Sequence, residues 1–250
     1  MDQPLSFQTA LDEVVPRFVA VLTQNVVGLC LAAVAWFGLV IAGVLAVLIV
    51  PFFVAGPGFG ILVMVYGEAE PPSWALLAVI LPSMLAYLVC FGGLLFGLTP
   101  AMQGSLYRAF DGALAGGALS AGAPLSSLRL HLRPVVLTNA TLVCGALLGF
   151  LLLVIPGLLF SLVTLFALPA AALDGLGPTA ALSRAVGHAR ANPGYHAGII
   201  LGAFLISMLG SAIPVLGSGL ATVVSMGWIC ACYRRAFPAD AGATEAAGLA

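Results

Sequence analysis

Four stretches of the chain contain no Asp, Glu, Lys or Arg, and each exceeds the roughly 20 residues that a helix needs to span a bilayer. They cover residues 18–67, 71–107, 134–173 and 191–233. Helices in the core of a soluble protein need only about 10–14 apolar residues, whereas here 62% of all residues are hydrophobic. Backbone groups in lipid must be hydrogen-bonded within their own helix. The sequence therefore predicts an all-α, polytopic membrane helix bundle.

Proline and glycine divide these tracts into predicted spans. The third tract is long enough for two spans, and Ile155-Pro156-Gly157 lies at its middle. The region 195–236 repeats this plan, with its turn at Ile213-Pro214 followed by Gly217 and Gly219, because proline removes a backbone donor and glycine frees φ. We predict a single transmembrane bundle over residues 20–236 with about six helices, at about 20–49, 74–98, 134–154, 157–173, 195–212 and 216–236.

Arginine determines the predicted topology. All eight basic residues are arginines, and basic residues in short loops stay on the cytoplasmic side. An odd number of crossings in residues 20–66 places all of them on one face, whereas an even number separates Arg17 from the others. Three crossings would each be shorter than a bilayer requires. We therefore predict one long first span followed by a bent or re-entrant segment over 50–66, with the 67–73 loop outside and both termini cytoplasmic.

The remaining segments are predicted to lie at or outside the membrane surface. Residues 1–19 have the spacing of an amphipathic helix in the interface, and a second short helix begins at Gly177-Pro178-Thr179. The Ala/Gly-rich residues 237–250 are predicted to be a disordered tail. The absence of lysine is a composition seen in GC-rich bacterial genomes, and we therefore expect the bacterial cytoplasmic (inner) membrane as the location.

Two sets of residues are candidates for function or assembly. Arg129 and Arg133 share one face of a predicted helix, and Arg184 and Arg190 lie on the short helix between the two hairpins. We predict that these four contact lipid headgroups, although fixing the orientation of the protein is an equal alternative. The second set has four-residue spacing, which allows close helix approach within the monomer or between two copies: Gly194, Gly198 and Gly202.

The two hairpins and the short helix between them carry a family resemblance. The motifs are Ile155-Pro156-Gly157, Leu168-Pro169, Ala181-Leu182-Ser183-Arg184, Asn192-Pro193-Gly194 and the closing Tyr233-Arg234. Over residues 134–236 the chain resembles a loose group of bacterial multi-pass proteins of unknown function, which includes the membrane domain that accompanies some glycerophosphodiester phosphodiesterases. It departs from that pattern at Ala185, where relatives often have serine. The resemblance implies a six-helix-type bundle and a membrane-associated role, without the phosphodiesterase catalytic domain.

No catalytic or metal-binding pattern is found in the sequence. The carboxylates are scattered, and His131, His188 and His196 lack the spacing of metal ligands. The five cysteines contain no Cys-x-x-Cys pair. A net charge of −1 argues against nucleic-acid binding. We therefore expect no enzyme activity, no cofactor and no metal.

The sequence leaves two classes of function open. The preferred one is a non-enzymatic membrane protein whose cytoplasmic, arginine-bearing face engages anionic lipid or a partner protein. The partner is either a different protein or a second copy of this chain in a homo-oligomer. The alternative is a small transporter or lipid-handling permease for a neutral or lipidic substrate, since the predicted spans contain no ionisable group at mid-membrane. A water-accessible cavity reaching mid-membrane would favour the alternative.

Overall fold

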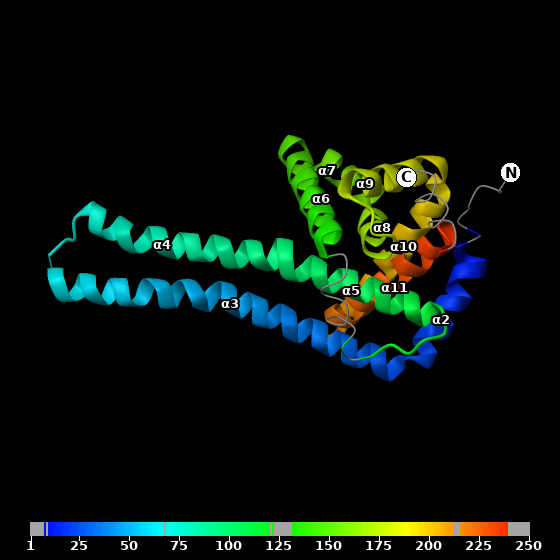
Figure 1. The fold of residues 1–250 in the computed structure, drawn as a ribbon, viewed down its shortest axis with the longest axis horizontal. Coiled ribbons are helices and arrows are strands. Elements are labelled where there is room, and N and C mark those ends of the chain that lie inside the picture. Colours follow the sequence, from blue (N-terminus) through cyan, green and yellow to red (C-terminus); the bar gives the residue numbers. More distant parts are fainter. Residues whose placement is uncertain are drawn as a thin grey trace. The chain divides into compact units, whose positions relative to one another are not determined.

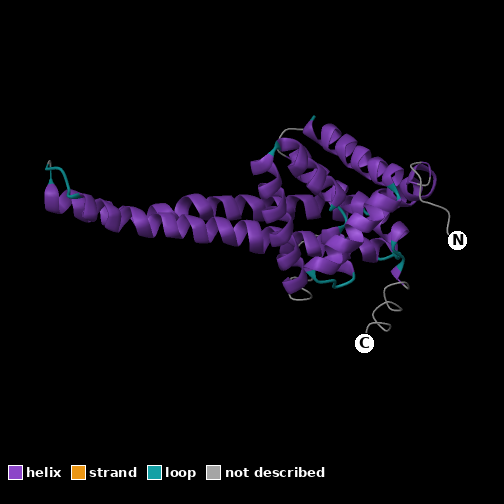
Figure 2. Ribbon diagram, turned by 90° about the horizontal axis from the view of Figure 1, so that it is seen from above, coloured by secondary structure: helices purple, strands orange, loops and turns teal. Residues whose placement is uncertain are grey.

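The computed structural model describes residues 8, 10–67, 69–120, 122, 132–212 and 216–239. Within these residues the regular structure is entirely helical (Figures 1 and 2), which confirms the all-α prediction for the described part of the chain. Two short segments, η1 and η2, are π-helical. The elements in chain order are η1 Ala10–Val14, α2 Val15–Gln24, α3 Val26–Tyr66, α4 Ser73–Gly92, η2 Gly93–Leu98, α5 Thr99–Leu114, α6 Leu132–Leu152, α7 Val154–Val163, α8 Ala167–Leu173, α9 Pro178–Ala191, α10 Pro193–Ser211 and α11 Leu216–Ala236.

Five helical stretches of the described residues are long and apolar enough to cross a membrane: Val26–Tyr66, Ser73–Leu114, Leu132–Leu152, Val154–Leu173 and Pro193–Ser211. Several such helices are expected of a multi-pass integral membrane protein. The predicted sixth span corresponds to α11, which is not one of the five. The count of about six therefore stays a prediction, as do the bacterial inner membrane and the cytoplasmic termini.

Helix α3 bears on the segment over residues 50–66, which was predicted to be either bent or re-entrant. It continues through Pro51 and Pro57 to Tyr66 without interruption, so residues 50–66 extend α3 and are not re-entrant. Each proline costs its helix one backbone donor, and transmembrane helices tolerate this where local adjustments satisfy the freed carbonyl. The flanking residues are uniformly apolar, so helix remains the favoured state on both sides of each proline. An ideal helix of this length measures about 60 Å, about twice the hydrocarbon core of a bilayer.

The chain divides into two compact units: Gly38–Thr99 forms one, and Met1–Phe37 with Pro100–Ala250 forms the other. In the first unit, α3 and α4 lie side by side (Figures 1 and 2). Glycine permits this, because a Cβ at Gly43 would lie 2.5 Å from a methyl carbon of Leu94 and one at Gly58 would lie 2.8 Å from Val79. The outer faces are apolar, with Phe52 72% exposed. Such a surface suits a lipid environment.

The second unit contains the two expected hairpins. In the first, the break between α6 and α7 is at Leu153, whose backbone is extended with φ −167° and ψ 151°. The predicted break at residues 155–157 was therefore placed slightly too late, since Pro156 is accommodated in the first turn of α7. Gly149 and Gly157 face each other, and a Cβ on Gly149 would lie 2.7 Å from the Gly157 Cα. The second hairpin pairs α10 with α11.

The N-terminal helix packs against α11 in the same unit. The ring of Phe18 in α2 lies edge-on to that of Trp228, with centroids 5.7 Å apart. At the junction of α2 and α3, the Asn25 amide donates to the Val21 carbonyl at 3.0 Å and accepts from the Leu119 backbone N–H at 2.8 Å. These contacts fix the start of α3 next to the segment that follows α5. Contact of residues 1–19 with a membrane interface stays a prediction, and residues 1–7 and 9 lie outside the described residues.

Candidate functional site

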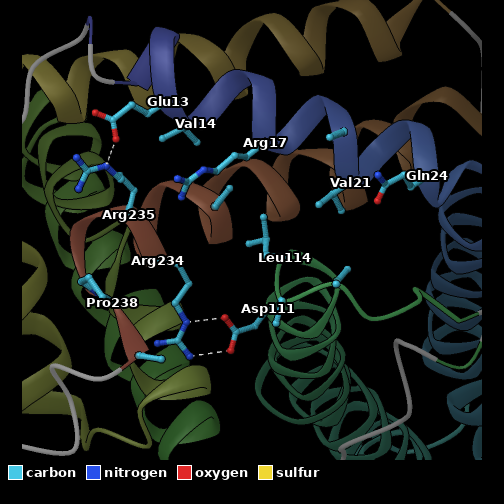
Figure 3. A pocket seen from close by; sticks show the side chains of 16 residues that line it. Glu13, Val14, Arg17, Val21, Gln24, Asp111, Leu114, Arg234, Arg235 and Pro238 are labelled. Carbon is cyan, nitrogen blue, oxygen red and sulfur yellow. Dashed lines mark hydrogen bonds and ion pairs between the residues drawn. The ribbon is translucent and has the colours of Figure 1, made fainter.

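A pocket of about 650 Å³ lies in the second unit, between η1–α2, the end of α5 and the last turns of α11 (Figure 3). Part of its wall is apolar and well packed, since Val14 is 2% exposed and Val21 is 7% exposed. Exposed lining residues, among them Gln24 and Gly116, leave the pocket open to its surroundings. Five charged side chains complete the lining: Glu13, Arg17, Asp111, Arg234 and Arg235.

Two arginine–carboxylate pairs connect the helices around the pocket. Arg234 donates from Nε to Asp111 Oδ1 at 2.6 Å and from Nη2 to Oδ2 at 2.7 Å, which is the bidentate geometry that fits a guanidinium to a carboxylate. Arg235 donates from Nε to Glu13 Oε2 at 2.6 Å. Figure 3 shows both pairs. Each carboxylate that lines the pocket is therefore neutralised by an arginine of α11.

Arg17 is the remaining charged residue of the lining. Its side chain is exposed and extends from α2 toward α11 (Figure 3), with no hydrogen bond or ion pair to any residue that the structure describes. The hydrogen bond from Arg235 lowers the pKa of Glu13 below its usual value, and the positive charge of Arg17 acts in the same direction. Glu13 is thus ionised at neutral pH. With both carboxylates paired, the pocket has one positive charge in excess.

A second group of polar contacts surrounds Asp174 at the end of α8. Its Oδ2 accepts from Arg184 Nη1 at 2.6 Å and from the Tyr233 hydroxyl at 2.5 Å, and its Oδ1 accepts from Arg234 Nη1 at 3.0 Å. The Asp174 side chain is only 13% exposed. One carboxylate therefore joins α8, α9 and α11, and Arg234 extends the network to Asp111.

The four predicted headgroup arginines have different surroundings. Arg184 is held by Asp174, with its side chain 15% exposed. Arg133 in α6 and Arg190 in α9 are exposed and have no hydrogen-bond or ion-pair partner among the described residues. Arg129 lies outside the described residues. A lipid-headgroup role for the four stays a prediction, and of the three described positions Arg133 and Arg190 are open to a ligand.

Of the three glycines predicted to allow close helix approach, Gly202 at the C-terminal end has this role. A Cβ on Gly202 would lie 2.5 Å from Nε1 of Trp228, whose indole N–H donates to the Ile199 carbonyl at 3.0 Å. Gly198 is buried. A Cβ on Gly194, in contrast, would meet open space. Gly202 thus permits packing of α10 on α11 within the monomer.

Two buried histidines lie in an aromatic cluster around Phe166. The ring centroid of Phe166 is 5.3 Å from that of His188, 5.5 Å from that of His196 and 5.4 Å from that of Tyr233. His196 Nε2 contacts the Leu162 carbonyl at 2.7 Å. Burial lowers the pKa of His188 to about 4, and the charge of His196 acts in the same direction. Among the described residues no group of three His, Cys, Asp or Glu side chains could hold a metal ion.

Sequence reasoning did not identify the pocket. Arg17 was predicted only as a marker of topology, and Glu13 was not predicted to line a site. Asp111 was predicted to pair with Arg108 and not with Arg234. The available signal was the presence of Glu13 and Arg17 in one short amphipathic segment. Nothing in the sequence indicates that residues 111–116 and 231–239 approach that segment, because they are separated from it by about a hundred residues or more.

Comparison with protein family models, with curated proteins and with solved structures finds no match for this chain. The resemblance of residues 134–236 to the phosphodiesterase-associated membrane domain therefore stays a prediction.

Proposed function

We propose that this chain is a non-enzymatic, multi-pass membrane protein of the bacterial inner membrane whose cytoplasmic, arginine-bearing face binds anionic lipid. The observation that carries the proposal is the state of three described arginines. Arg17, Arg133 and Arg190 are exposed and have no hydrogen-bond or ion-pair partner among the described residues. All three belong to helices at or next to predicted ends of membrane spans.

Their chemistry supports lipid as the ligand. A guanidinium is always charged at physiological pH and binds phosphate oxygens with two parallel N–H donors. Basic residues close to an anionic leaflet each contribute roughly 1 kcal/mol to attraction. This attraction is screened within about 10 Å at 0.1 M salt, so only arginines near the headgroups contribute. Three such residues can therefore produce a measurable preference for anionic over zwitterionic lipid.

Lipid titration followed by native mass spectrometry tests the proposal. The purified protein in a neutral detergent is titrated with phosphatidylglycerol and, separately, with phosphatidylcholine. We expect wild-type protein to retain more phosphatidylglycerol, and the triple variant R17Q/R133Q/R190Q to lose most of that preference. The matched variant R17K/R133K/R190K keeps the three charges and should retain the preference. Equal retention of the two lipids by wild-type protein would contradict the proposal.

The proposal favours lipid over the other partners that the sequence left open. A partner protein or a second copy of this chain could use the same exposed arginines. Neither would produce a preference between the two lipids in purified monomer, so the titration separates them from lipid binding. Transport of a neutral or lipidic substrate stays an alternative, and it predicts substrate flux in proteoliposomes that is independent of the three arginines.

A further inference from the structure

The pocket beside Arg17 has the charge pattern of a site for a single anion. Three arginines and two carboxylates line it, and both carboxylates are bound by arginines of α11. The Arg17 guanidinium is left without a partner among the described residues. A ligand with one negative charge would neutralise it without displacing either ion pair. The volume of about 650 Å³ lies within the range of roughly 300–1,000 Å³ typical of small-ligand sites.

The walls of the pocket require a ligand that is also partly apolar. Leu114 in the lining is half-buried, and Ala20, Ala115 and Pro238 are exposed, so the pocket presents apolar surface to a ligand. A small hydrophilic anion would leave this surface exposed to water. An amphiphile would cover it, and burial of apolar area is favourable.

The position of the pocket along the chain indicates lipid as the source of that amphiphile. Gln24 in its lining lies two residues before α3, the most apolar span candidate, begins at Val26. Arg17 lies shortly before the predicted first span, which begins at about residue 20, and lipid headgroups occupy the level at which spans end.

We propose that this pocket binds the headgroup of one anionic phospholipid, with Arg17 contacting its phosphate and the apolar wall contacting its glycerol and upper acyl region. This inference rests on the proposed function, and it adds a discrete site to a face that could otherwise attract lipid diffusely. Arg235 is held by Glu13 in the same lining. Loss of the Glu13 carboxylate would therefore free a second guanidinium to bind the anion in this pocket.

The test resolves the first bound lipid by native mass spectrometry of the full chain titrated with phosphatidylglycerol. We expect R17Q to lower the affinity for the first lipid by about fivefold or more, the loss of one interfacial charge. The matched variant R190Q removes an exposed arginine of the same proposed face that lies outside the lining, and it should lower that affinity less than R17Q does. E13Q should raise it. Unchanged thermal unfolding of R17Q in detergent verifies that the fold is intact.

Each other outcome has a defined meaning. If R17Q and R190Q lower the affinity for phosphatidylglycerol equally, the lipid binds diffusely over the arginine-bearing face. The proposed pocket site is then wrong, while the proposed function stands. If wild-type protein shows no preference for phosphatidylglycerol over phosphatidylcholine, the proposed function itself is wrong. If soluble glycerol 3-phosphate displaces the first lipid at equal concentration, the site recognises a free phosphate ester, and its assignment to a phospholipid is overturned.

Discussion

Arg234 and Asp111 form a bidentate pair across 123 positions of the chain, with N–O distances of 2.6 and 2.7 Å. The third contact of this guanidinium, from Nη1, is to Asp174 Oδ1 at 3.0 Å. One arginine at the end of α11 therefore joins α5 to the end of α8. Arg184 and Tyr233 complete the coordination of Asp174. We regard this network as the polar clamp that holds the helix ends around the pocket.

The first prediction concerns Asp174 in this clamp. D174N keeps the shape of the side chain but removes the charge that two arginines share, in a position that is 13% exposed. Removing one partner of a buried pair leaves the other charges uncompensated, and we expect a loss of about 2–4 kcal/mol in stability. Unfolding of the protein in detergent by heat or SDS measures it.

The matched control for D174N is E13Q. Glu13 pairs with Arg235, and the two side chains are 46% and 36% exposed. Exposed pairs contribute little to stability because water and salt screen them. We therefore expect E13Q to leave the unfolding midpoint nearly unchanged. Similar destabilisation by both variants would show that the network around Asp174 does not act as a clamp.

The second prediction compares two glycines of the same helix. G202A places a methyl group against the rigid indole of Trp228, at 2.5 Å in the unrelaxed geometry. Overpacking of this kind typically costs about 1–3 kcal/mol. G194A meets open space and replaces glycine by a better helix former, which stabilises a helix by up to about 1 kcal/mol. The two variants should therefore shift Tm in opposite directions, and a drop in both would contradict the packing described for α10 on α11.

The helical character of the chain could be predicted from sequence because it depends on local properties. Uncharged tracts of spanning length can satisfy their backbone only as helices, and Pro156 lies close to the break between α6 and α7, whereas Pro214 lies outside the described residues. At Pro51 and Pro57 the same local reasoning left a bent and a re-entrant segment open. One lost hydrogen bond per proline is a small cost beside the apolar helix that continues on both sides, so α3 is not interrupted.

The candidate site could not be predicted because it depends on contacts between distant segments. The partner of Arg234 is far away in the sequence, as is that of Arg235, which pairs with Glu13 over 222 positions. Arg184 was expected to face lipid headgroups, but whether an arginine is paired depends on which carboxylate folds next to it. The importance of Arg17 follows from the absence of such a partner among the described residues, which no local pattern reveals.

The third prediction concerns the pH dependence of stability. Burial lowers the pKa of His188 to about 4, whereas an exposed histidine titrates near 6.5. Between these values the unfolded chain binds more protons than the folded one, so stability falls as pH falls from about 6.5 through 4. The loss is at most about 3 kcal/mol. The variant H188F keeps an aromatic ring between Phe166 and Tyr195 and should lose this part of the dependence.

The comparison of H188F with wild-type protein isolates His188. Acid protonates the carboxylates of both proteins alike, so their contribution cancels in the difference between the two Tm–pH curves. We expect the difference to change sharply between pH 6.5 and 4 and to be constant above pH 7. A difference that is flat over the whole range would mean that His188 is charged or solvated in the folded state.

The last prediction concerns topology. The Glu70 side chain is exposed in the segment between α3 and α4. The rule that basic residues stay cytoplasmic, applied to the eight arginines, predicts that this segment lies outside the cell. Arg17 and Glu70 lie on either side of one uninterrupted apolar helix, which supports an odd number of crossings between them. In a background without the five native cysteines, E70C should react with an impermeant maleimide in intact cells. A239C, at an exposed position beyond α11, should react only after permeabilisation. Reaction of A239C in intact cells together with protection of E70C would invert the topology, and it would place Arg17 and its pocket on the outer surface.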